Sequence, residues 1–332
     1  MDALRGAAAI LVLIRHYFNL SALGPVATYI DPGTMGVVAF FCISGYVIPW
    51  SVLRKPTTVG QFLLSRGFRL YPAYWVSLAL AALVFPLATH QLLANISMAQ
   101  RFIGVPDAIG VYWTLQVELI FYVLIAVLLF TGRLADPRTS LWCLLGACAL
   151  SVALAVPRAV LLVKTPVAPA FSLVVMFGSF VLYHHRHGGY LSTRQLRILL
   201  LGALAILMCC CVLAYRTDWG AGETPRRFIV AYLVGVGLFI GFMRLNLDTP
   251  VLRWLGSISY PLYLVHVPMR QLIVELMPTL GGTATAALGI MATLAVAAAM
   301  HRAVELPLVN AGKAVIARYG STRQAAKAGA IQ

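Results

Sequence analysis

The stretch RGAAAILVLIRH, residues 5–16, has nine small or apolar residues among its twelve, the composition of a membrane-spanning helix. It also carries Arg5, Arg15 and His16. Charged side chains are costly inside a bilayer, and they usually face a protein interior or a water-filled cavity. We therefore expect this helix to present a functional polar face within a membrane protein.

The whole chain shares this apolar character, since 61% of its 332 residues are hydrophobic and only 11% are charged. A soluble protein of this size carries about 25% charged residues. The apolar runs are continuous rather than alternating, which favours helices over a β-barrel. The sequence thus predicts an all-α polytopic membrane protein with about ten transmembrane helices and no soluble domain. The predicted spans are residues 4–22, 34–53, 68–88, 111–131, 140–157, 167–183, 196–215, 227–243, 254–276 and 283–303.

The net charge of +15 indicates an orientation and a class of partner. Basic residues gather in alternate loops, so the positive-inside rule predicts that both termini lie in the cytoplasm, and we expect a bacterial inner membrane. The predicted outer loop 216–227 is an exception, because it contains three arginines. Most of the excess charge fits contact with anionic membrane lipids, and the remainder fits a polyanionic ligand such as a nucleotide-bearing cofactor. The sequence contains no aromatic-basic motif for nucleic acid, so we exclude that partner.

Arg5 and His16 are predicted to lie on one face of the first helix. They are eleven residues apart, which corresponds to three turns plus about 20° and to about 16 Å along the axis. Asp2 falls near the same stripe. A histidine at this depth is a candidate catalytic group, although it can also be a neutral, hydrogen-bonded structural residue. Arg15 points about 80° away from Arg5, and the sequence identifies no partner for it.

Two further segments place charges in apolar surroundings. Glu118 is expected to be buried in the fourth span, where a carboxylate needs a cation, and His16 is the predicted partner. The alternative is an inert glutamate that is bonded to a neighbouring helix. Arg66 and Arg69 are one turn apart at a predicted helix start, where two cations can bind phosphate or simply anchor the helix on the cytoplasmic side.

The last spans contain more polar groups. Tyr260, Tyr263 and His266 are spaced three apart and either line a cavity or pack between helices. His301 and Glu305 are one turn apart, and a proline two residues further on is expected to end the last span. The segment HHRH at 184–187 has no carboxylate or cysteine beside it, so we interpret it as a basic loop and expect no metal site.

Six motifs follow one another along most of the chain. They are DALRGAAAILVLIRH (2–16), FFCISGYVI (40–48), RGFRLYPAYW (66–75), YWTLQVELIFY (112–122), LGSISYPLYLVHVP (255–268) and VELP (304–307). As an ordered set they resemble the membrane acyltransferases of the acyltransferase-3 type, which O-acylate sugars and other acceptors. The chain resembles the stand-alone branch, which lacks a C-terminal hydrolase domain and includes exopolysaccharide and O-antigen O-acetyltransferases.

The resemblance implies roles for four residues. It implies that His16 is the catalytic base. It also implies that Arg5, Arg66 and Arg69 serve the acyl-CoA side, with cytoplasmic acetyl-CoA as the usual donor. The expected acceptor is a carbohydrate or glycolipid hydroxyl.

The remaining site assignments follow from reasoning about the chemistry. We expect Glu118 to orient or stabilise the His16 imidazole, as an acid does in a catalytic triad. Ser44, Tyr263 and His266 are candidates for contact with the substrate. We expect residues 1–310 to form the transmembrane acyltransferase domain and residues 311–332 to form a basic cytoplasmic tail.

Two other functions remain open from the sequence. Intramembrane Arg, His and Glu residues could form a proton relay in a transporter or flippase for a lipid-linked sugar or small metabolite. The chain could also be a non-catalytic scaffold in a polysaccharide synthesis complex, in which case loss of His16 would be tolerated.

Overall fold

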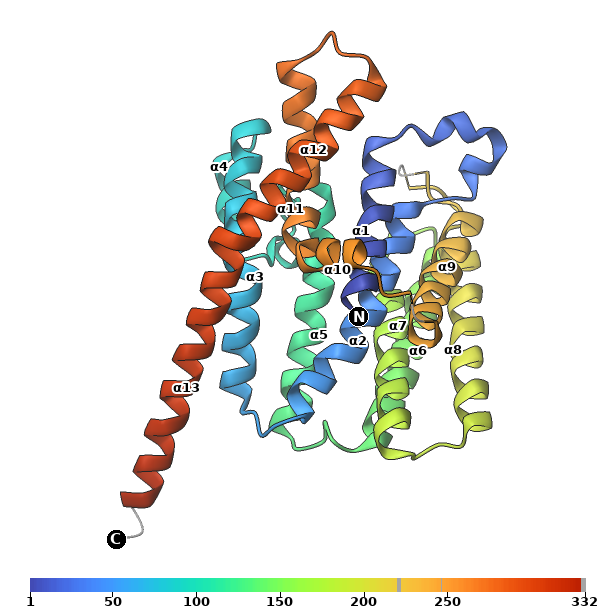
Figure 1. The fold of residues 1–332 in the computed structure, drawn as a ribbon. Helices are drawn as coiled ribbons and strands as arrows, with labels where there is room; N and C mark the ends of the chain where they lie inside the picture. The colour runs from blue at the N-terminus through green and yellow to red at the C-terminus, as the bar shows by residue number, and fades with distance from the viewer. Residues whose placement is uncertain (220–221, 246, 330–332) are drawn as a thin grey trace. The chain divides into compact units, whose positions relative to one another are not determined.

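The computed structural model describes residues 1–219, 222–245 and 247–329, and within these ranges it contains helices and no strand (Figure 1). Eight helices in the described ranges are long and apolar enough to cross a membrane. The prediction of an all-α polytopic membrane protein is therefore confirmed. The predicted number of ten spans is wrong, and the two discrepancies lie at residues 4–22 and 254–276.

Both discrepancies have a physical cause. The first helix, α1 (Asp2–Tyr17), has only 16 residues, about 24 Å of helix against a hydrocarbon core of about 30 Å. The predicted span 254–276 is two helices, α10 (Pro250–Ser257) and α11 (Ser259–Leu276), separated at Ile258. Hydropathy alone conceals such a break, because an irregular backbone is tolerated at membrane depth where protein surrounds it.

The chain divides into two compact units, of which the first comprises residues 1–55 and 117–257. Helix α5 (Trp113–Phe130) begins in the second unit and continues in the first. The other elements of the first unit are α1, η1 (Leu20–Thr28), α2 (Pro32–Leu53), α6 (Pro137–Val160), α7 (Val167–Gly188), α8 (Thr193–Ala214), α9 (Pro225–Arg244) and α10.

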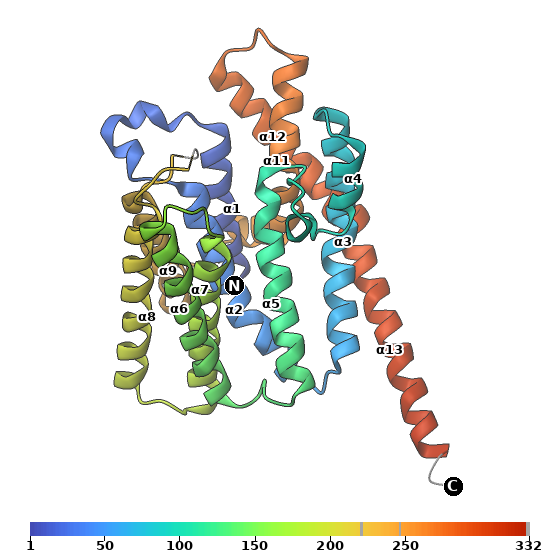
Figure 2. The same cartoon turned by 180° about the vertical axis from the view of Figure 1, so that it is seen from behind.

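Helix α7 lies at the centre of the first unit and packs against α2, α6 and α8. It is the most buried of the candidate spans. Helix α2 packs against α1 and α9 as well as α7. Large apolar side chains on α6, α8 and α9, among them Trp142, Leu201 and Leu233, are exposed, as expected for helices that face lipid. Helices α7 and α8 are joined at one end by residues 189–192 (Figure 2).

The second unit comprises residues 56–116 and 258–332. Its elements besides the start of α5 are α3 (Val59–Val84), α4 (Thr89–Ile96), η2 (Gln100–Ile103), η3 (Gly110–Tyr112), α11, α12 (Gly282–Met300), η4 (His301–Glu305) and α13 (Leu306–Gly329). Helix α11 packs against α3 and α12, and α13 runs beside α3 (Figures 1 and 2). The segment 89–110, expected to be a loop, is thus partly helical.

The prediction that Pro307 ends the last helix is wrong. Element η4 is a π-helical turn that leads directly into α13, and Pro307 lies in the first turn of α13. Proline is accommodated there because the preceding π turn already interrupts the i→i−4 hydrogen-bond pattern of the continuous helix. The predicted tail from residue 311 is therefore helical up to residue 329, and residues 330–332 lie outside the described part of the chain.

Candidate active site

Helix α1 holds Arg5 and His16 in one uninterrupted helix, as the sequence predicts. Arg5 Nη1 donates to Asp2 Oδ1 at 2.9 Å, one turn earlier. His16 is half-buried at the last turn. An ion pair as exposed as Asp2–Arg5 adds only about 0–1 kcal/mol to stability, so its main effect is to orient the guanidinium group.

Two glycines bring α10 into close contact with the start of α1. A Cβ atom on Gly256 would overlap the main-chain oxygen of Asp2, and one on Gly6 would overlap the main-chain oxygen of Leu252. Small residues are the usual means by which membrane helices approach this closely. Arg5 therefore lies between two residues, Asp2 and Gly6, whose backbone is in close contact with α10.

The other end of α1 is fixed by an ion-pair cluster that the sequence did not reveal. Asp31 is buried at the N-cap of α2, where Oδ1 accepts from Thr34 N at 3.2 Å. Its Oδ2 accepts from Arg227 Nη2 at 2.6 Å and from Arg227 Nε at 3.0 Å. Arg15 Nε lies 3.5 Å from Asp31 Oδ1. Asp31 is thus a partner of Arg15, directly beside His16. An aspartate followed by Pro32 is a helix-start signal, but it does not predict the long-range partners.

Glu118 is half-buried on α5 and accepts a hydrogen bond from Tyr122 Oη, at 2.5 Å, one turn further along the helix. The hydroxyl group fixes one carboxylate oxygen. Tyr122 lies within the motif that the sequence singles out, and the i,i+4 spacing is the signal that would have identified it. The pairing of Glu118 with His16 stays a prediction.

Ser44 lies half-buried on α2, next to Gly45. A Cβ atom on Gly45 would overlap the main-chain oxygen of Met176 on α7. Gly45 therefore has a structural role, because it permits α2 and α7 to approach closely.

In the second unit, Arg66 and Arg69 lie on α3. The helix begins at Val59, so both arginines are in its interior and not at a helix start as predicted. The guanidinium carbon of Arg66 lies 5.4 Å from the centre of the Phe62 ring. Both arginines are half-buried and one turn apart, which retains the spacing needed to bind one phosphate from two positions.

The tyrosines of α11 hold helices together. Tyr260 Oη donates to the Leu70 carbonyl oxygen at 2.7 Å, and Tyr263 Oη donates to that of Val111 at 3.0 Å. The Tyr263 and Thr114 hydroxyl groups are 2.8 Å apart. His266 is fully buried, with Nδ1 2.7 Å from the Tyr263 carbonyl oxygen. Packing between helices, one of the two interpretations of this stripe, is therefore observed; contact with substrate stays a prediction.

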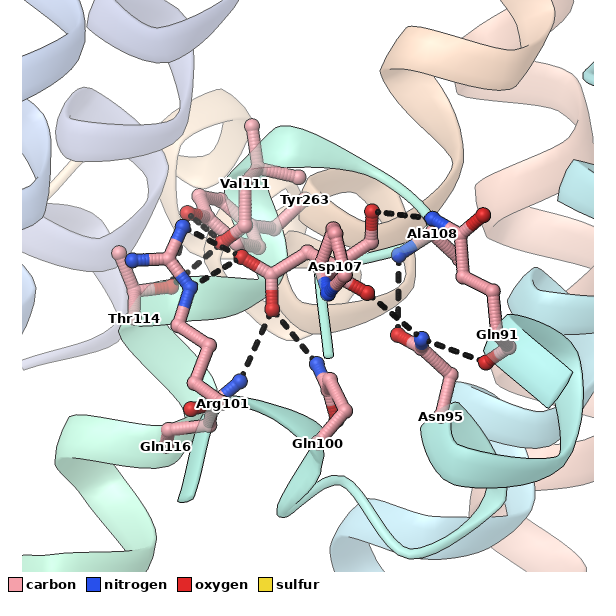
Figure 3. A network of polar contacts seen from close by, with 11 residues as sticks. Gln91, Asn95, Gln100, Arg101, Asp107, Ala108, Val111, Thr114, Gln116 and Tyr263 are labelled. Atoms are coloured by element: carbon pink, nitrogen blue, oxygen red, sulfur yellow. Dashed lines mark hydrogen bonds and ion pairs between the residues drawn. The ribbon is translucent and has the colours of Figure 1, made fainter. Parts of the chain in front are cut away.

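The segment between α4 and α5 is organised by Asp107, whose side chain is 2% exposed (Figure 3). One carboxylate oxygen accepts from Gln100 Nε2 at 2.6 Å and Gln116 Nε2 at 2.9 Å, and the other accepts from Arg101 Nε at 2.6 Å. Asn95 adds bonds to main-chain groups of the same segment. The sequence places residues 89–110 between two predicted spans but does not predict this network, because its members are separated by turns of irregular backbone.

The HHRH cluster is the last turn of α7 and not a loop, and its first histidine, His184, is buried. Among the residues that the structure describes, no three His, Cys, Asp or Glu side chains gather closely enough to hold a metal ion.

Two of the three arginines of segment 216–227 have defined partners. Arg227 bonds Asp31, Arg226 Nη1 donates to Tyr29 Oη at 2.8 Å, and Glu223 forms an ion pair with the buried Arg158. Arg226 and Arg227 therefore have structural contacts, and the cytoplasmic location of the termini stays a prediction.

Comparison with known proteins gives the family. The family model described as an acyltransferase domain, of the acyltransferase-3 type, matches residues 1–302. The exopolysaccharide production protein ExoZ of Rhizobium meliloti (strain 1021) is 27% identical over 328 residues, covering 89% of this chain and 95% of ExoZ. Nodulation protein 10 of Rhizobium leguminosarum bv. viciae is 32% identical over 40% of this chain, and the match spans less than half (44%) of that protein.

An O-acetyl transferase of Shigella phage Sf6 is 36% identical over 76 residues, which is 22% of each chain. No solved structure matches. The family match covers most of the chain, including the first five of the six motifs, and agrees with the eight apolar helices of the described ranges. This chain belongs to the acyltransferase-3 family of membrane acyltransferases.

Proposed function

We propose that this membrane O-acyltransferase transfers an acyl group, acetyl in the first instance, from cytoplasmic acyl-CoA to a hydroxyl group of a carbohydrate or glycolipid. The observation that carries the proposal is the arrangement of α1. A half-buried histidine stands about 16 Å along the axis from an arginine that Asp2 orients. Both ends of the helix are fixed, so the distance between the two groups is constant.

The reaction needs one group that moves a proton. His16 accepts the proton of the acceptor hydroxyl while the oxygen attacks the thioester carbonyl carbon. The C–S bond breaks, the new C–O ester bond remains, and the imidazolium returns its proton to the leaving thiolate. The products are the O-acyl ester and free CoA, and the histidine is regenerated.

The other residues support this step. The Glu118 carboxylate, held by Tyr122, stabilises the imidazolium that forms on His16, as the acid of a catalytic triad does. Ser44, Tyr263 and His266 are assigned to the substrate. His266 is buried and Tyr263 is engaged with Thr114, so we expect these two to act mainly by shaping the site.

Arg5, Arg66 and Arg69 are assigned to the phosphate groups of acyl-CoA. Guanidinium groups bind phosphate through parallel hydrogen bonds, and they remain charged at any physiological pH. The donor is a polyanion, which agrees with the chain's net charge of +15.

The proposed class of acceptor is inferred from the names of the relatives. One is named for exopolysaccharide production and another is named an O-acetyl transferase. We therefore propose a sugar hydroxyl as the acceptor, on a polysaccharide or its lipid-linked precursor, with both termini of the enzyme in the cytoplasm.

Transfer of radiolabel from acetyl-CoA by the purified protein in liposomes tests this function. We expect His16→Ala to abolish labelling of the acceptor, because no other group replaces the base. His90→Ala is the matched control, since His90 is exposed on α4 and should leave turnover unchanged. Wild-type turnover by His16→Ala would refute the assignment, and a wild-type protein that moves the acceptor across the membrane without labelling it would indicate a transporter.

A further inference from the structure

An apolar groove of about 130 Å³ lies in the first unit between α7, α8 and α9. Leu182, Leu200 and Ile240 line it toward one end, and Cys42 and Phe239, both buried, form its floor. The groove is open beside Gly178, because a Cβ atom there would meet only Leu200 Cδ2, at an ordinary van der Waals distance of 3.6 Å. The groove is independent of the residues that we assign to acyl transfer.

The bilayer, not water, is the medium that reaches this groove. It lies between three helices that are each long and apolar enough to span a membrane. An apolar cavity of this size stays dry, and an enclosed one of about 150 Å³ admits a benzene ring. Lipid tails are as apolar as leucine, so the groove gives an acyl chain a defined place but little net attraction. Any preference for one lipid must come from its headgroup.

Three arginines lie one helical turn beyond the same end of the groove. Arg186 follows Leu182 by four residues, Arg197 precedes Leu200 by three, and Arg244 follows Ile240 by four, so each cation is about 4.5–6 Å further along its helix. Arg186 Nη1 lies 3.8 Å from the sulfur atom of Met243, which places the ends of α7 and α9 together.

These arginines are available for a ligand. All three are exposed, and none has a carboxylate partner among the described residues. Asp136 lies near His184 and accepts from Arg138 N at 2.9 Å at the start of α6. Asp248, four residues after Arg244, forms an ion pair with Arg253, whose Nε lies 3.6 Å from Asp248 Oδ1. The end of the groove therefore has an uncompensated positive potential, and guanidinium groups bind phosphate oxygens well.

We propose that this groove is a binding site for one anionic phospholipid, with an acyl chain against Gly178 and the phosphate at Arg186, Arg197 and Arg244. The positive-inside rule alone explains arginines at a helix end, but it does not require them to converge on an apolar groove. Part of the lipid's acyl chain would lie along the exposed surface of α8, where Ile198 and Leu201 project outward.

Native mass spectrometry of the detergent-purified full chain, titrated with phosphatidylglycerol or phosphatidylethanolamine, tests the site. We expect one phosphatidylglycerol per chain to remain bound under conditions that remove phosphatidylethanolamine. The triple variant Arg186→Gln/Arg197→Gln/Arg244→Gln should lower this preference at least tenfold, since each arginine near an anionic lipid contributes about fivefold.

The matched control is Lys164→Gln/Arg216→Gln/Lys313→Gln, which removes the same charge from exposed positions away from this end of the groove; Lys164 precedes α7 and Arg216 follows α8. It should keep the preference. A second variant, Gly178→Leu, fills the groove and should reduce labelling of α8 by a phosphatidylglycerol with a photoactivatable acyl chain. An equal loss in both triple variants, equal binding of the two lipids, or a dimer that buries α8 would each overturn the proposal. Size-exclusion and circular dichroism profiles identify any variant that fails to fold.

Discussion

Arg227 and Asp31 lie 196 positions apart in the chain and are joined by two hydrogen bonds to one carboxylate oxygen, of 2.6 and 3.0 Å. Arg15 approaches the other oxygen of the same carboxylate. Through this carboxylate the start of α9 and the start of α2 are tied to the last turn of α1. The residue that follows Arg15 is His16, so the cluster positions the proposed base without contacting the reaction.

Asp31→Asn should lower the thermal unfolding midpoint of the detergent-solubilised protein by a few degrees. A lost hydrogen bond to a charged group costs about 2 kcal/mol, while asparagine caps a helix as well as aspartate does, so only the ion pairs are removed. A double-mutant cycle with Arg227→Gln should give a coupling energy of about 1–3 kcal/mol. Additive effects of the two changes would contradict the cluster.

Gly256→Ala should destabilise the protein by about 1–3 kcal/mol, the usual cost of inserting a methyl group into a packed contact. The added Cβ atom would overlap the Asp2 main-chain oxygen and displace α1, so acyl transfer should fall as well. Gly237→Ala is the control, since a Cβ atom there meets nothing within 4 Å and alanine favours a helix. Equal midpoints for the two variants would show that α10 does not approach α1 as described.

Arg69→Gln should raise the KM for acyl-CoA about 10- to 100-fold and change kcat much less. This is the loss of about 1.5–3 kcal/mol expected when a charge-assisted hydrogen bond to phosphate is removed. Arg69→Lys should be intermediate, because an ammonium group retains the charge but not the planar pair of donors.

The Arg69→Gln substitution should not change the kinetics with a donor that lacks the nucleotide. With acetyl-pantetheine, which carries no phosphate group, wild-type protein and Arg69→Gln should have similar kinetics. A similar loss with both donors would assign Arg69 to folding or to the thioester end and not to the phosphate groups.

Asp107→Asn should speed amide hydrogen exchange throughout segment 91–108. The new amide group has to face donors from Gln100, Gln116 and Arg101 with one acceptor oxygen in place of two, and each unsatisfied buried group costs about 1–3 kcal/mol. Arg101→Gln is the milder control, because the Arg101 side chain is 53% exposed. Unchanged exchange in Asp107→Asn would mean that the segment is held by Asn95 alone.

Properties that depend on local sequence could be predicted. Apolar runs gave the helical class and most of the spans, and the 3.6-residue period placed Arg5 and His16 on one helix at the right separation. The i,i+3 relation of Asp2 and Arg5 is an observed ion pair. Ordered motifs gave the family, which the comparison confirms.

Properties that depend on residues distant in the sequence could not be predicted. Nothing near Arg15 in the sequence indicates that Asp31 and Arg227 meet it, because each belongs to a different helix. The break at Ile258 was hidden because hydropathy averages over it. Pro307 was taken as a helix end because proline usually breaks a helix interior, and nothing in the sequence indicated the π turn that accommodates it.

The π turn at His301–Glu305 sets the rotation of everything that follows it. A π turn holds one more residue than an α turn needs, and His301 Nδ1 and Glu305 Oε2 bridge it at 2.7 Å. If residues 301–305 formed ordinary α-helix with no residue removed, α13 would be rotated by about 100° around its own axis. Gly312, which now rests on the Phe68 side chain, would then face elsewhere, so the seating of the C-terminal helix on α3 depends on one inserted amino acid.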